Sequence, residues 1–109
     1  PITSQLTPGN FVKFNYICNQ YNILPTKNFI KNLSLILDIY KKNKDVLFIN
    51  FLFFMADFYL KYLKEKNLLK NNQIFDLKNY IFDNLNSYMM YNINRNSLIN
   101  ALNEKLKYE

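Results

Sequence analysis

Few side chains in this sequence could carry out catalysis or hold a metal. There is no His and only one Cys, Cys18, so the usual ligands of a zinc site and the Cys–His pair of a nucleophilic enzyme are missing. The sequence has no GxxxxGK[ST] motif, and its one glycine, Gly9, cannot form a phosphate cradle. We therefore expect no catalytic residue, no metal site and no cofactor, and we interpret the chain as a non-enzyme.

Four aspartates are the remaining candidates for acid–base chemistry: Asp38, Asp45, Asp57 and Asp76. Their spacing does not place two carboxylates on one helix face beside an apolar pocket, as a general acid–base pair requires. We expect solvated or helix-capping roles for them. A small helical enzyme stays open as a third hypothesis, with no residue to nominate for its chemistry.

Basic residues outnumber acidic ones, and many of them lie in the middle of the chain. The net charge is +6. Residues 41–70 contain Lys41, Lys42, Lys44, Lys61, Lys64, Lys66 and Lys70 against three acidic residues. Such lysines could bind phosphate backbones or acidic partners. They could also lie in the last turns of two helices, where cations complement the helix dipole. We favour the second interpretation, because no Arg cluster or Gly-rich loop accompanies them.

The length and composition are typical of one folded domain, or of one domain plus a fragment of another. The 109 residues are 50% hydrophobic and include ten Phe and nine Tyr, which argues against disorder. A lone cysteine cannot form an internal disulfide, so we expect a reducing, cytoplasmic environment. The chain begins at Pro1 without an initiator Met and shows no signal peptide, so we expect a piece of a longer protein.

The rest of the chain is organised around an apolar stretch, Val46–Leu63. At about 100° per residue, Asn50, Asp57, Lys61 and Lys64 form one narrow polar strip on this helix. Asp57 and Lys61 have the spacing of a helical ion pair. The stretch is barely long enough to span a membrane and contains charges, so we expect a buried core helix and no membrane partner. A helix this apolar needs neighbours on several sides.

Four further helices are expected around this central one, which makes five in all. Apolar spacing and turn residues predict helices at residues 7–21, 26–43, about 45–66, 73–91 and 95–108. The expected N-caps are Thr7, Thr26, Asp45 and Asn94. No alternating run flanked by turn residues indicates a strand. The predicted fold class is all-α, a bundle of about five helices built around a central apolar helix.

The helix expected at residues 73–91 has an unusually wide apolar face. One stripe contains Ile74, Leu77, Ile81, Leu85 and Tyr88, and a second contains Phe75, Phe82 and Met89. Together they cover roughly 200° of the helix, more than one core contact requires. Either this helix lies in a groove between two others, or its second stripe contacts another chain. The candidate subunit-interface residues are Phe75, Phe82, Met89 and Arg95.

Three segments, Leu6–Phe11, Phe51–Leu63 and Ile93–Leu106, resemble in the right order the C-terminal part of the delta-prime subunit of bacterial DNA polymerase III, the clamp loader. The first is similar to the SPG-x-A-L element that starts the last helix of the ATPase-like lid, with Thr7 in place of Ser. The second resembles the long apolar helix of the collar domain. The third, with its Asn94-Arg95 opening and leucine stripe, is similar to the family's final helix.

This resemblance implies that residues 1–21 are the last helix of an upstream, ATPase-lid-like domain and residues 26–109 a helical collar (oligomerisation) domain. Clamp loaders are five-subunit rings held together mainly by collars, and delta-prime does not hydrolyse ATP productively. The implied function is non-catalytic subunit assembly for sliding-clamp loading in DNA replication, within a holoenzyme that is a nucleotidyltransferase. The implied partners are gamma/tau and delta, with DNA contacted only through the assembly. A basic helical nucleic-acid-binding module is the alternative.

Overall fold

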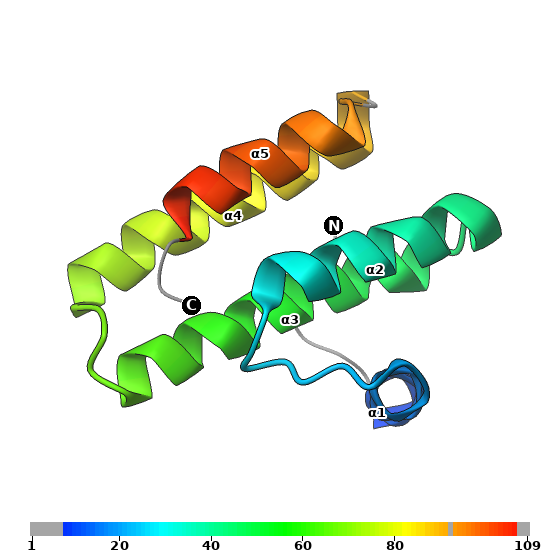
Figure 1. Cartoon of the computed structure of the whole chain (residues 1–109), viewed down its shortest axis with the longest axis horizontal. Coiled ribbons are helices and arrows are strands. Elements are labelled where there is room, and N and C mark those ends of the chain that lie inside the picture. Colours follow the sequence, from blue (N-terminus) through cyan, green and yellow to red (C-terminus); the bar gives the residue numbers. More distant parts are fainter. Residues whose placement is uncertain (1–7, 92, 107–109) are drawn as a thin grey trace.

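Five helices make up the computed structural model, which describes residues 8–91 and 93–106 (Figure 1). They are α1 (Pro8–Tyr21), α2 (Phe29–Asn43), α3 (Val46–Glu65), α4 (Asn71–Tyr91) and α5 (Arg95–Lys105). None of the described residues forms a strand. The predicted all-α bundle of about five helices is confirmed.

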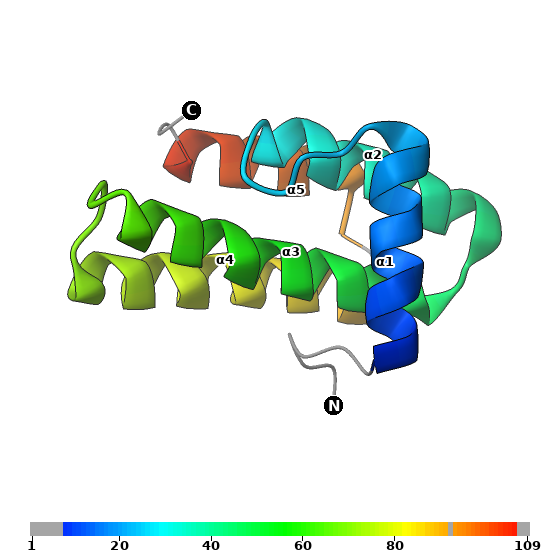
Figure 2. The same cartoon turned by 90° about the horizontal axis from the view of Figure 1, so that it is seen from below.

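Helices α2, α3, α4 and α5 form the bundle, and α1 crosses it. Contacts run from α2 to α3, α3 to α4, α4 to α5, and back from α5 to α2. In Figure 1 the α2–α3 hairpin lies along the α4–α5 hairpin. Figure 2 shows α1 lying across the bundle rather than along it. The short connections make successive bundle helices antiparallel, because a few residues cannot carry the chain back to the other end.

The central position of α3 follows from its apolar circumference. Its buried residues are Phe48, Ile49, Phe51, Leu52, Phe53, Met55, Ala56, Tyr59, Leu60 and Leu63. On one side Tyr59 stacks on Phe29 of α2, with ring centroids 5.0 Å apart. On another, the ring of Phe53 meets that of Phe82 of α4 edge-on at 4.9 Å. The prediction that several helices surround this one is confirmed.

The third side of α3 is covered by α1. Phe14 of α1 is buried, and its ring lies 5.1 Å from Phe51 and 5.0 Å from Phe54, both in edge-on geometry. Such aromatic pairs are worth about 0.5–1.5 kcal/mol beyond the area they bury. They hold α1 over the N-terminal half of α3. The assignment of residues 1–21 to a separate domain stays a prediction.

Among the described residues, α3 is also long and apolar enough to cross a membrane by length and composition alone. In the structure 56% of its most apolar window is buried inside the bundle. The core helix of a folded domain has these same properties. In this structure α1, α2 and α4 pack against α3.

Two of the expected helix caps are confirmed by direct hydrogen bonds. The Asp45 carboxylate accepts from the backbone N–H of Leu47 at 3.0 Å, and the Asn94 side chain accepts from the N–H of Asn96 at 2.7 Å. Each satisfies a donor that the first helical turn leaves open. Thr7 lies outside the described residues.

The predicted cap at Thr26 is wrong, because α2 begins three residues later, at Phe29. Asn28 precedes it in the left-handed region, with φ 54°, a conformation that Asn tolerates better than most residues. The loop is held from inside the helix: the buried amide of Asn32 donates to the carbonyl oxygens of Leu24 and Lys27, at 2.9 Å each. The Asn32 side chain therefore holds this loop, rather than a cap by the Thr26 hydroxyl.

The boundaries of the last two helices also differ from the prediction. α4 begins at Asn71 rather than Gln73, because the Gln73 side chain reaches back and accepts from the N–H of Lys70 at 2.8 Å. That contact is half of a capping box and places Gln73 inside the first turn. α5 ends at Lys105, whereas the sequence predicted residue 108; residues 107–109 lie outside the described residues.

The buried thiol of Cys18 on α1 should make the folded chain less stable as the pH becomes alkaline. Burial raises the pKa of this thiol to about 11, whereas the pKa of a cysteine thiol in an unfolded chain is about 8.5. As the pH rises from about 9 to 11, the unfolded chain loses a proton that the folded chain keeps, so stability falls. We expect wild type to lose about 1–2 kcal/mol more than Cys18→Ala over this window. Urea denaturation of both proteins at several pH values measures this difference, and parallel curves would contradict it.

Candidate subunit interface

Two of the four candidate interface residues, Phe75 and Phe82, lie on the same side of α4. Their spacing of seven residues, with Lys78 between them, places all three on one side of the helix. The Lys78 ammonium lies 5.3 Å from the centre of the Phe82 ring. Phe82 is half-buried against Phe53 of α3, whereas Phe75 is 65% exposed. One ring therefore anchors α4, and the other remains open to contact.

An ion pair also links this side of α4 to α3. The Asp57 carboxylate lies 3.2 Å from the Lys78 ammonium, and 3.3 Å from that of Lys61 on its own helix. The predicted Asp57–Lys61 pair is confirmed. Lys78 is a partner that sequence spacing could not reveal, because it lies on another helix. Asp57 thus joins the exposed edge of α3 to the side of α4 that carries Phe75.

The same edge of α3 carries further aromatic rings. Phe54 and Phe58 lie three residues before and one residue after Asp57, with ring centroids 6.2 Å apart. Phe11 of α1 meets Phe54 edge-on at 5.9 Å. Phe11 and Phe58 are 45% and 42% exposed.

We call Phe11, Phe54, Phe58, Phe75 and Phe82 the aromatic face. It spans three helices around the Asp57 ion pairs. Phe11 and Phe58 were not among the residues that the sequence nominated. An apolar circumference cannot tell which edge of α3 its neighbours leave uncovered, so sequence alone offers no signal for Phe58.

The other two candidate residues, Met89 and Arg95, lie away from Phe75, at the opposite end of α4. Both line a hollow between the ends of α2 and α4. The Arg95 guanidinium lies 3.0 Å from the Asp38 carboxylate and donates to the Ser34 carbonyl oxygen at 3.3 Å, both on α2. Arg95 therefore ties α5 to α2. The structure brings the four candidates together as two pairs, not as one site.

The lysines of residues 41–70 also separate into two groups. Lys41 and Lys42 lie in the last turn of α2, and Lys64 in the last turn of α3. Because α3 runs away from the end of α2, its 20 residues place the groups about 30 Å apart. The arrangement agrees with the interpretation that these lysines complement helix dipoles.

Three of the four aspartates considered for acid–base chemistry have structural partners. Asp45 caps α3, Asp57 pairs with Lys61 and Lys78, and Asp38 pairs with Arg95. Asp76 is exposed on α4. Within the part of the chain that the structure describes, no three acidic or cysteine side chains come together as metal ligands would.

Comparison with known proteins does not identify a relative: no protein-family model, curated protein or solved structure matches the chain significantly.

Proposed function

We propose that the chain is a non-catalytic helical assembly domain that joins a larger complex through the aromatic face. The observation that carries the proposal is Phe75, a large apolar ring that is 65% exposed on a well-packed helix. Phe11 and Phe58 extend the exposed aromatic surface onto two other helices. Aromatic residues are enriched at the centres of protein–protein interfaces, where they lose little conformational entropy on binding.

The packing contacts beneath this surface support the proposal. Phe82 packs edge-on against Phe53, and Phe54 packs against Phe14. Asp57 of α3 forms an ion pair with Lys78 of α4. A surface that is already ordered loses less conformational entropy on association than one that must fold first. The charges around Asp57 give the face a polar centre, which would orient a partner.

The sequence resemblance gives the proposal its specific form. If Leu6–Phe11, Phe51–Leu63 and Ile93–Leu106 belong to a delta-prime subunit, residues 26–109 form its collar domain. The partners are then the gamma/tau and delta subunits of a DNA polymerase III clamp loader. In this role the chain works in the cytoplasm, supports sliding-clamp loading, and contacts DNA only through the assembly.

Size-exclusion chromatography with light scattering tests the assembly role. The purified chain is mixed with the gamma/tau and delta collar domains of the same source, with and without ATP. We expect a stable complex whose mass does not depend on nucleotide, because neither the aromatic face nor its surroundings provides a phosphate-binding loop. A chain that elutes as a monomer from every mixture at micromolar concentration overturns the proposal.

A further inference from the structure

A basic hollow lies at the end of the bundle where the last turns of α2 and α4 meet the start of α5. Its volume is about 250 Å³, and it is lined by Tyr40, Lys41, Lys44, Tyr88, Met89, Ile93 and Arg95. These residues come from three helices and two connections. Nothing in the proposed role of the aromatic face uses them.

Positive charge in the hollow comes mainly from Lys41 and Lys44. The third cation, Arg95, is already engaged by Asp38 and the Ser34 carbonyl. Within residues 8–91 and 93–106, neither lysine lies within ion-pairing distance of a carboxylate. The Lys44 ammonium lies 5.7 Å from the centre of the Tyr40 ring. The hollow therefore keeps two uncompensated cations, offset only in part by the C-terminal dipole of α2.

The hollow also offers a neutral hydrogen-bond donor. Burial raises the pKa of the Tyr88 phenol; the nearby Tyr40 and Asp38 raise it further, and Arg95 lowers it. The phenol therefore keeps its proton at neutral pH and can donate to an anion that enters. Tyr40, Tyr88 and Arg95 all line the hollow, so the phenol lies beside its cations.

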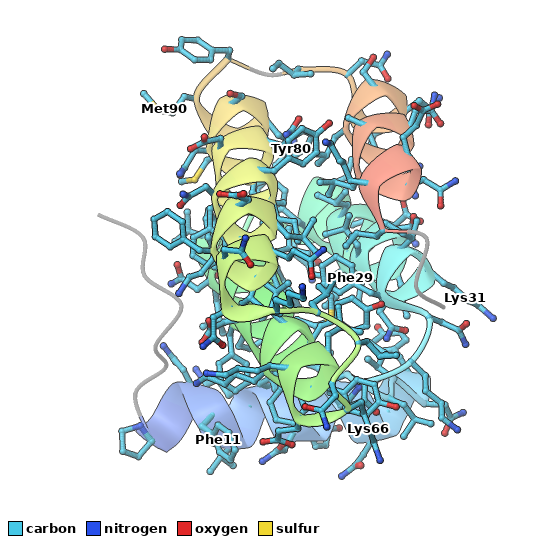
Figure 3. The ribbon with its side chains drawn as sticks, turned by 90° about the vertical axis from the view of Figure 1, so that its left-hand side faces the viewer. Phe11, Phe29, Lys31, Lys66, Tyr80 and Met90 are labelled. Carbon is cyan, nitrogen blue, oxygen red and sulfur yellow. The ribbon has the colours of Figure 1, made fainter. Side chains whose placement is uncertain are left out.

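Two apolar residues, Met89 and Ile93, form the remaining wall of the hollow. Met90 and Tyr91, which follow Met89 in the chain, are 70% and 72% exposed. Figure 3 shows Met90 projecting away from the bundle at the end of α4. A phosphate site would use a free arginine fork or a cradle of backbone N–H groups, whereas the Arg95 guanidinium is already engaged by Asp38 and the Ser34 carbonyl oxygen.

We propose that the basic hollow receives a Glu or Asp side chain from an amphipathic, acidic helix of a partner protein, whose apolar residues cover Met89 and Ile93. The proposal rests on the assembly role and adds the chemistry of the partner. Lys41 and Lys44 attract the carboxylate, and the Tyr88 hydroxyl donates to it. Such a contact sets partner choice and orientation beside the apolar contact of the aromatic face.

A peptide titration followed by NMR tests the site. The probe is a short helical peptide of leucine and glutamate, acetylated and amidated, and its counterpart carries glutamine for glutamate. We expect the acidic peptide to shift the methyl signals of Met89 and Ile93. Binding should weaken roughly fivefold when the lysine partners are lost in Lys41→Gln/Lys44→Gln. The matched control, Lys64→Gln/Lys66→Gln, removes the same charge from the other end of α3 and should bind as wild type does.

Two results overturn the inference: equal weakening in both double variants, or tighter binding of inorganic phosphate or a short DNA duplex at the same methyl groups. The peptide assay does not involve the aromatic face, so the two proposals fail separately. Failure of the collar mixtures to form a complex overturns the assembly role alone. A complex that forms while the hollow ignores the acidic peptide overturns the inference alone.

Discussion

Replacement of Phe51 by alanine should lower the free energy of unfolding by about 3–5 kcal/mol. Phe51 is fully buried on α3, and its ring meets Phe14 at 5.1 Å and Phe48 at 5.7 Å. Truncation removes apolar contact and leaves a cavity where α1 crosses α3, and that site cannot collapse without moving α1. A domain of this size has a total stability of roughly 5–15 kcal/mol. The variant should therefore lose a large part of its stability, as measured by urea denaturation with circular dichroism.

Phe58→Ala is the matched control for this experiment. It makes the same chemical change on the same helix, seven residues later, at a ring that is 42% exposed. Solvent already contacts this ring, and truncation leaves a shallow indentation rather than a cavity. We expect a loss of about 1 kcal/mol or less. Equal losses in the two variants would mean that Phe51 does not anchor α1, and the placement of α1 on α3 would then be wrong.

The features that the sequence predicted correctly depend on interactions within one helix or its first turn. Asp45 and Asn94 cap their helices because a short polar side chain can reach the adjacent open N–H groups. Asp57 and Lys61 pair because four residues make just over one turn. The buried helix around them was predictable because an apolar circumference is stable only when neighbours cover it.

The features that it predicted wrongly, or missed, depend on contacts between elements. The start of α2 is set by the Asn32 amide, which bonds a loop carbonyl eight residues earlier. Among the non-glycine residues with positive φ, Asn22, Asn28 and Asn67 end or connect helices. Part of the asparagine content of the chain therefore serves these turns. Among the described residues Asn32 is the only buried asparagine, and the sequence does not show that burial.

The candidate interface shows the same division. The spacing of Phe75, Phe82 and Met89 indicated that a second stripe exists, but not which of its members another helix covers. Phe53 packs on Phe82, and the end of α2 faces Met89, so two of the three share the core with neighbours. Arg95 is a candidate for a contact between subunits, and within this chain it contacts Asp38. Helix–helix register, which no local pattern encodes, separates these outcomes.

Phe75→Asp should therefore impair assembly, and Phe82→Asp should lower stability, although both changes place a carboxylate on the same stripe of α4. Asp at position 75 replaces an exposed ring, so we expect helicity and the urea midpoint to stay near wild type. The same change should weaken the complex with the collar domains at least 100-fold, because truncating a hot-spot aromatic costs about 2–4 kcal/mol and a charge must also be desolvated.

Asp at position 82 instead removes the ring that packs on Phe53 and puts a charge in a half-buried position. We expect a loss of about 3–5 kcal/mol in the free energy of unfolding. Circular dichroism with urea measures stability, and light scattering of the mixtures measures assembly, so each variant is examined in both assays. If Phe75→Asp unfolds the chain, Phe75 is a core residue. If Phe75→Asp folds and still assembles as wild type does, the partner does not bind the aromatic face. Only a folded Phe75→Asp chain that no longer assembles agrees with an exposed ring used for contact between subunits.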